Sequence, residues 1–363
     1  MATKRNTKNE ELDGSFLDED SNALPPNDII AYNELRSCAD LYRMYKDKVL
    51  DIDPDFQRGE VWPEAQKTRF IDSLIKKMPI PSLCFSLDYN TEKWEVIDGL
   101  QRITSIIKFL DDKDWRLSKL DDVDEKLSGK LVSEIKLIDN GILYTRLTNL
   151  TIPVTVLRCD YKKASHTNYL FTIFHRLNTG GIKLTNQEIR NAIYNGHLNT
   201  QLKDLSNNNS EWRKIVGLKE NETKRLSKVE LILRFFSFFD NLSDYNGKLS
   251  KFLNDYMNLH KNPTPNWIET KEKLFNETVS IIYHKIGDKK SAGLSNVYIE
   301  AILYGIGKNL NFLKNKNGAE VKGYLEKLKK NEHFSDEKLS EGLSSKSKVN
   351  NRLSAAKKIF SGK

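Results

Sequence analysis

The chain has 363 residues, of which 38% are hydrophobic and 30% are charged, so it is long enough for two folded domains with substantial cores. No apolar run approaches the roughly 20 residues that a membrane-spanning helix needs, and the polar first 22 residues lack the apolar segment of a secretory signal. Three widely spaced cysteines, Cys38, Cys84 and Cys159, form neither a metal-ligand pattern nor a disulfide framework, which favours a reducing, cytoplasmic location away from membranes.

The net charge of +8 is concentrated in the last third of the chain. Residues 1–240 contain 36 Lys and Arg against 37 Asp and Glu, whereas residues 241–363 contain 22 against 13. Such a basic region favours polyanions such as DNA through counterion release. Lysines that solubilise a helical domain would give the same count, so the charge alone leaves both interpretations open.

The first predicted elements follow a polar segment. Residues 1–28 are too polar to fold alone and are expected to form a disordered tail. Residues 33–48 are rich in helix-forming residues, and Ser37 could cap that helix. A short strand at 48–52 and an amphipathic helix at 63–77 are expected next.

The middle of the chain alternates between strand and helix signals. Residues 80–99 predict two strands joined by a polar turn, followed by a helix over 100–110. Asn140-Gly141 predicts a hairpin within 137–147, and 151–159 reads as another strand. From residue 165 onward helical patterns dominate, which predicts a front half that contains a sheet and a helical back half.

The segment VIDGLQRITS, residues 96–105, lies between a predicted strand and a predicted helix. Asp98 stands where a helix N-cap belongs, and Gln101 could close a capping box. Arg102 does not fit that interpretation, because a cation in the first helical turn is unfavourable by about 0.3–1 kcal/mol. An anion bound at the helix start would reverse this balance. A capped helix and a phosphate site both remain open from these residues.

A second strand-to-helix junction, DPDFQRGEVW at residues 53–62, carries similar chemistry. It sets Gln57 and Arg58 beside a glycine, which lets the backbone turn sharply. The alternative is a surface arginine paired with a neighbouring carboxylate. Two junctions of matching type lead us to expect that Arg58 and Arg102 converge on one anion pocket.

A third stretch, residues 174–196, joins two predicted helices through a Gly-Gly pair. Thr185 and Glu188 are spaced as a capping box, so Glu188 is expected to be structural. The glycines would let backbone approach a ligand, and three side chains offer anion-binding donors: Arg176, Asn178 and Arg190. A helix-turn-helix that binds DNA is the rival interpretation, although the turn is long for that motif.

These three stretches, in this order, resemble the N-terminal domain family of GmrSD-type modification-dependent restriction enzymes, ParB-like domains named for a DGQQR motif. The matching segments are residues 56–62, 96–106 and 174–192, and the resemblance covers roughly residues 35–194. It implies an α+β chain with a ParB/sulfiredoxin-like mixed-sheet N-terminal core and a mainly helical C-terminal domain. The expected division is a tail at 1–28, a nucleotide-binding domain at 29–195 and a basic helical domain at 196–363.

The resemblance also implies an activity and its residues. Family members look like NTP hydrolases that gate cleavage of phage DNA carrying modified bases or backbone. Four residues would form the signature loop, with Asp98 either positioning Mg²⁺ or orienting water: Asp98, Gly99, Gln101 and Arg102. Gln57 and Arg58 would face this loop, and three more residues would complete the nucleotide pocket: Arg176, Asn178 and Gly181.

Two departures bear on these expectations. Leu100 stands where the family usually has glutamine, which makes nucleotide binding a safer expectation than hydrolysis. The six histidines are scattered without the grouping that an HNH nuclease needs, so we expect DNA cleavage to require a partner nuclease. The alternative function is a non-enzymatic DNA-binding sensor whose arginines hold DNA phosphates, and a nuclease that uses the arginine pocket itself is a third option.

Overall fold

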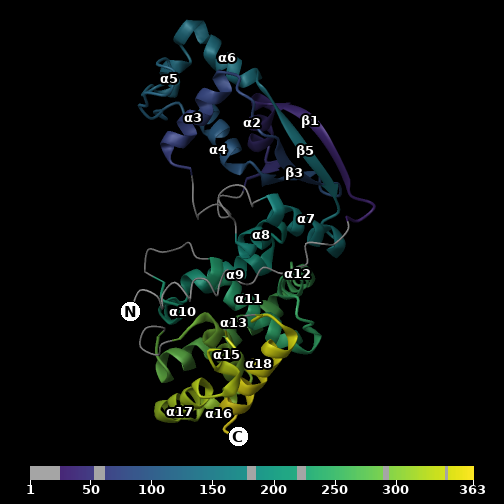
Figure 1. Ribbon diagram of the computed structural model, residues 1–363, viewed down its shortest axis with the longest axis vertical. Helices are drawn as coiled ribbons and strands as arrows, with labels where there is room; N and C mark the ends of the chain where they lie inside the picture. Colours follow the sequence, from purple (N-terminus) through teal and green to yellow (C-terminus); the bar gives the residue numbers. More distant parts are fainter. Residues whose placement is uncertain (1–24, 53–61, 178–184, 219–225, 289–293, 340–341) are drawn as a thin grey trace. The chain divides into compact units, whose positions relative to one another are not determined.

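The computed structural model describes residues 25–52, 62–177, 185–218, 226–288, 294–339 and 342–363 (Figure 1). The chain divides into two compact units, one within residues 24–184 and one within residues 185–363. The first unit contains a five-stranded mixed sheet with helices, and the second is helical. The α+β class predicted from the sequence is therefore confirmed. Within the described ranges, no helix is long and apolar enough to cross a membrane.

The elements of the first unit are β1 (Ile30–Ser37), α2 (Cys38–Lys46), β2 (Leu50–Asp51), α3 (Glu64–Ile75), β3 (Leu83–Asp88), β4 (Lys93–Asp98), α4 (Leu100–Asp111), α5 (Val132–Ile135), η2 (Ile138–Gly141), α6 (Ile142–Asn149), β5 (Thr151–Cys159) and α7 (Ala164–Leu177). Those of the second are α8 (Asn186–Ile193), α9 (His197–Asn208), α10 (Ser210–Ile215), α11 (Leu226–Asn241), η4 (Leu242–Asp244), α12 (Leu249–Leu259), α13 (Pro265–Lys285), α15 (Asn296–Gly307), α16 (Leu310–Lys314), α17 (Gly318–Lys329), η5 (Glu332–Phe334) and α18 (Lys346–Phe360).

The sheet has the strand order β1-β5-β3-β4-β2. β5 pairs antiparallel with β1 and parallel with β3, β3 pairs antiparallel with β4, and β4 pairs parallel with β2. Side chains of β5 alternate: Ile152, Val154 and Val156 are at most 1% exposed, whereas Thr151 is exposed and Thr155 is half-buried. One face of the sheet is therefore the core face, and α2, α3 and α4 lie together on one side of the sheet in Figure 1.

The first strand corrects the helix predicted over residues 33–48. Residues 33–37 belong to β1, which pairs with β5 over its whole length, and the helix begins only at Cys38. The predicted capping role of Ser37 is confirmed, because its hydroxyl accepts a 3.0 Å bond from the Asp40 backbone N–H. Local helix-forming content in residues 33–36 is thus outweighed by hydrogen bonding to a strand more than 110 residues later.

The Asn140-Gly141 pair also differs from its predicted role. The hairpin expected within residues 137–147 is wrong, because η2 and α6 occupy this stretch. Asn140 and Gly141 do adopt positive φ values, 53° and 81°, as a tight turn requires. Their backbone preference is realised between two helical segments, since no strand flanks them.

Glu64, in the first turn of α3, joins that helix to α4. Its carboxylate accepts hydrogen bonds from Lys67 at 2.7 Å, from Lys108 at 3.1 Å and from the Trp115 ring N–H at 2.7 Å. Partial burial raises the pKa of Glu64, but these three donors outweigh it and lower the pKa to about 2. The carboxylate therefore stays ionised over the physiological range and holds both helices in register.

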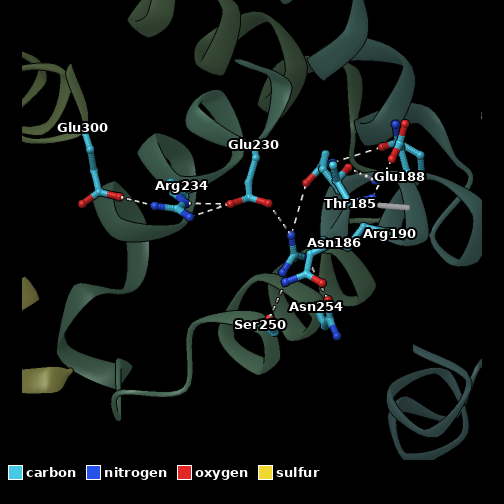
Figure 2. Close-up of polar contacts among 11 residues, drawn as sticks. Thr185, Asn186, Glu188, Arg190, Glu230, Arg234, Ser250, Asn254 and Glu300 are labelled. Atoms are coloured by element: carbon cyan, nitrogen blue, oxygen red, sulfur yellow. Dashed lines mark hydrogen bonds and ion pairs between the residues drawn. The ribbon is translucent and has the colours of Figure 1, made fainter. Parts of the chain in front are cut away.

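In the helical unit, alternating charges run through the interior between helices (Figure 2). Glu230 of α11 accepts from Arg190 of α8 at 2.9 Å and from Arg234 at 2.6 Å. Arg234 also donates to Glu300 of α15 at 3.1 Å. Burial raises the pKa of Glu230, but the two arginines outweigh it and lower the pKa below its ordinary value. The pairs bind α8, α11 and α15 to one another inside the helical unit.

Candidate functional site

The signature loop lies at the junction of β4 and α4. Asp98 is the last residue of β4 and pairs with Cys84 of β3, and α4 begins two residues later. Gly99 links them with φ +94°, a left-handed conformation that side chains disfavour. A Cβ at this position would also lie 2.3 Å from Leu83 Cδ2. The strand-to-helix turn therefore requires glycine.

The capping-box interpretation of this loop is wrong. Gly99 occupies the N-cap position, and no side chain caps the helix within the part of the chain that the structure describes. The Asp98 carboxylate instead accepts a 2.7 Å bond from Arg102 Nη2, while Gln101 Oε1 accepts a 3.1 Å bond from the Trp62 backbone N–H. Strand pairing extends through Asp98 and leaves it one residue too early to cap the helix.

Arg102 is held at the helix start from two sides. Its Nη2 donates to Asp98, and its Nη1 donates to the carbonyl oxygen of Pro81. Its side chain is 13% exposed, whereas that of Asp98 is 40% exposed. Burial lowers the pKa of the Arg102 guanidinium and Asp98 opposes that effect, yet arginine remains charged at any physiological pH. The pair thus presents a fixed cation and a partly solvated carboxylate side by side.

Two further groups at this junction are open to a ligand. The first N–H groups of a helix have no intrahelical acceptor, and α4 has no side-chain cap among the described residues. The helix dipole adds positive potential at the same place. The second group is the Asp98 carboxylate. Its Oδ2 accepts the hydrogen bond from Arg102, and within the described ranges its Oδ1 has no hydrogen-bond partner. The arrangement can bind an anion at the helix start with a carboxylate oxygen beside it.

Leu100 occupies the position where glutamine was expected. Its side chain is only 7% exposed and belongs to the core of the first unit. The leucine therefore contributes to packing on the buried side of α4. The substitution leaves Asp98, Arg102 and the N–H groups of the first turn in place.

The other expected site residues are distributed as follows. Gln57, Arg58, Asn178 and Gly181 lie outside the described residues, so the predicted convergence of Arg58 with Arg102 stays a prediction. Arg176 is exposed in the last turn of α7, the helix that packs near β4 in the same unit.

The prediction that Arg190 is an anion-binding donor is wrong, because its guanidinium is buried and already bonded. Its side chain is 1% exposed and donates to Glu230 and, at 2.9 Å, to Asn254 (Figure 2). It also donates to Gln187 at 3.4 Å. Burial lowers the pKa of its guanidinium below the ordinary value, and Glu230 opposes that effect only in part. The capping box formed by Thr185 and Glu188 is confirmed, so Glu188 has the structural role predicted for it.

Sequence reasoning missed two backbone partners of the loop, the Pro81 carbonyl and the Trp62 N–H. Neither has a sequence signal, because any residue supplies a carbonyl or an amide and the fold alone decides which one meets Arg102 or Gln101. Trp62 directly follows residues 53–61, so the Gln101 bond attaches the end of the second motif to the start of α4. Within the described ranges, no group of three or more His, Cys, Asp or Glu side chains is arranged to hold a metal ion.

Comparison with known proteins finds one related family. Residues 38–195 match the family model described as the GmrSD restriction endonuclease N-terminal domain. No significant match is found among curated proteins or among solved structures. The matched segment contains all of the sheet strands except β1, together with the β4–α4 junction.

Proposed function

Because residues 38–195 belong to the N-terminal domain family of GmrSD restriction endonucleases, we propose that this component of a GmrSD-type restriction system binds and hydrolyses nucleoside triphosphates in modification-dependent antiphage defence. The observation that carries the proposal is the β4–α4 junction. It combines a fixed arginine, helix N–H groups that no described side chain caps and a carboxylate that is 40% exposed, all within one strand-to-helix turn.

Each part of this junction suits a phosphate. Backbone N–H groups at a helix start and a guanidinium both donate to phosphate oxygens, and fixed donors stabilise the charge that develops in phosphoryl transfer. The Asp98 carboxylate is the kind of oxygen ligand that Mg²⁺ accepts, and Mg²⁺ bound there would neutralise phosphate charge. Without the metal, the same carboxylate can orient an attacking water through Oδ1.

The second and third motifs complete the proposed pocket. Arg58 precedes Trp62 by four residues, which span at most about 14 Å when extended, and the Trp62 N–H is bonded to Gln101 at the start of α4. Within that limit, we propose that Arg58 and Gln57 contact the same phosphate. Arg176, Asn178 and Gly181 are proposed to form the remaining wall of the pocket.

The test is phosphate release from ATP, GTP, CTP and UTP with Mg²⁺, combined with calorimetric binding. We expect Arg102→Ala and Asp98→Asn to lower the turnover rate by about 10²–10³-fold, the usual effect of removing one group that stabilises transition-state charge. Arg146→Ala, at an exposed position on α6, is the matched control and should leave the rate unchanged. Absence of both binding and turnover in the wild type would refute the proposal.

A second role, contact with DNA or with a partner nuclease, is proposed for the helical unit. α18 contains five Lys and Arg and no Asp or Glu, and three of these side chains are exposed: Lys346, Lys357 and Lys358. In the non-enzymatic DNA-sensor alternative, the arginine pocket at the β4–α4 junction would hold DNA phosphate and the basic helix α18 would add affinity. It predicts salt-dependent DNA binding without turnover, with a loss on Lys357→Glu plus Lys358→Glu that fluorescence anisotropy would detect. Supercoiled plasmid with Mg²⁺ tests for intrinsic cleavage.

A further inference from the structure

One row of residues crosses four strands of the sheet and ends at the proposed phosphate site. Asn33 of β1 is the register partner of Thr155 of β5, Thr155 is that of Cys84 of β3, and Cys84 is that of Asp98 of β4. Register partners in a regular ladder point to the same face, about 4.8 Å apart, which places Asn33, Thr155 and Cys84 on one face. The register of β3 and β4 shifts between Cys84 and Phe85, so Asp98 ends the row beside a β-bulge. The row therefore spans about 14 Å from Asp98 to Asn33.

The end of this row away from Asp98 is polar and open. Ser82 Oγ lies 3.2 Å from Thr155 Oγ1, and Thr155 Oγ1 donates to Asn33 Oδ1 at 2.9 Å. Ser82 and Asn33 are exposed, and Thr155 is half-buried. Within the described part of the chain, the Asn33 side-chain amide nitrogen has no hydrogen-bond partner. We call Ser82, Thr155 and Asn33 the polar row.

Arg102 connects the polar row to the phosphate site. Its Nη1 donates to the carbonyl oxygen of Pro81 and lies 3.5 Å from that of Ser82. Beside the row, an apolar pair faces the same side of the sheet: Leu35 is two residues from Asn33 and is the register partner of Pro153. Leu35 is 68% exposed, so an apolar surface borders the polar row. The Ser82 hydroxyl also bonds the carbonyl oxygens of Leu83 at 3.0 Å and Pro153 at 3.3 Å, bonds that a ligand could replace.

We propose that the polar row binds the nucleoside part of the nucleotide whose phosphates lie at Arg102, with sugar or base polar groups on Ser82, Thr155 and Asn33 and the base against Leu35 and Pro153. This inference rests on the proposed nucleotide site, and it adds the direction in which the ligand extends. Hydroxyl and amide groups both donate and accept, which matches sugar hydroxyls and base edges, while a flat base gains from an apolar neighbour.

The experiment is isothermal titration calorimetry of the full chain with Mg²⁺, using ATP, GTP, CTP and UTP and, as a ligand without a nucleoside, inorganic tripolyphosphate. The wild type should bind at least one nucleotide more tightly than tripolyphosphate. Thr155→Val keeps the β-branched shape, removes the hydroxyl and should weaken that nucleotide about fivefold, with tripolyphosphate unchanged. Thr151→Val, at an exposed position on the same face of β5, is the matched control and should bind both ligands normally.

The outcomes separate this inference from the proposed function. Equal wild-type affinity for nucleotides and tripolyphosphate, or unchanged nucleotide affinity in both Thr155→Val and Asn33→Ala, would overturn the nucleoside site and leave the phosphate site standing. Loss of tripolyphosphate binding in Thr155→Val with a native circular dichroism spectrum would also overturn it. Binding of neither ligand by the wild type would remove the proposed function itself.

Discussion

Replacement of Gly99 by alanine is the sharpest test of the β4–α4 junction. At φ +94° an alanine is strained by about 1–2 kcal/mol. Its Cβ would also stand 2.3 Å from Leu83 Cδ2 and 3.0 Å from Arg102 Nη2. Leu83 is fully buried, so relief of this clash disturbs the core at a further cost of about 1–3 kcal/mol. We expect Gly99→Ala to lower the free energy of unfolding by about 2–5 kcal/mol.

The control is Gly323→Ala in α17. Nothing lies within 4 Å of a Cβ at that position, and alanine is the better helix former by about 1 kcal/mol, so this variant should be slightly more stable than the wild type. Equilibrium urea unfolding followed by far-UV circular dichroism would measure both. With a slope of about 2 kcal/mol per M, Gly99→Ala should lower the midpoint by about 1–2.5 M.

The two glycines lie in different compact units, which makes the result specific. Where the units unfold in separate transitions, Gly99→Ala should shift only one of them and Gly323→Ala only the other. A Gly99→Ala protein within about 0.5 kcal/mol of the wild type would refute the reasoning, because the left-handed turn and the contact with Leu83 could not then both be present.

Three further predictions concern stability. The pKa of Glu64 is depressed to about 2, so its ion pairs stabilise the fold fully above the unfolded pKa of 4.5, and this stabilisation is lost as pH falls toward 2. Glu64→Gln should therefore weaken the dependence of the free energy of unfolding on pH in this acid range. Glu92→Gln, on the exposed β3–β4 turn, is the control and should leave that dependence unchanged. Thr185→Ala should lower the free energy of unfolding by about 1 kcal/mol and shift the urea midpoint accordingly, and an unchanged midpoint would contradict the capping box. Glu230→Gln leaves two buried arginines without their shared carboxylate and should cost about 3–5 kcal/mol by the same measurement; a neutral effect would mean that the network is not desolvated.

Several features of the chain follow from interactions between residues that are close in sequence. The helix α4 coincides with the helix predicted over residues 100–110, and Thr185 caps α8 together with Glu188 three residues later. Contacts of this kind form within one or two turns of a helix, whatever the rest of the chain does. The α+β class and the conspicuous β4–α4 loop could therefore be predicted from the sequence.

The tertiary structure decided what those local elements do. Residues 33–36 became a strand because β5 supplies their hydrogen-bond partners, and Asp98 pairs with Arg102 because β4 continues through it. Arg190 became a buried structural cation because α11 places Glu230 against it.

The polar row shows most clearly which features can be predicted from the sequence and which depend on the tertiary structure. Period-two alternation along β5 can be read from the sequence, but which residue of β1, β3 or β4 stands beside Thr155 depends on strand order and register. Register is set by the joint burial of one whole sheet face, which involves residues more than 100 positions apart. The sequence by itself determined the locally encoded helices and caps and the motif at residues 98–102, whereas long-range packing decided the first strand and which side chains meet at the motif.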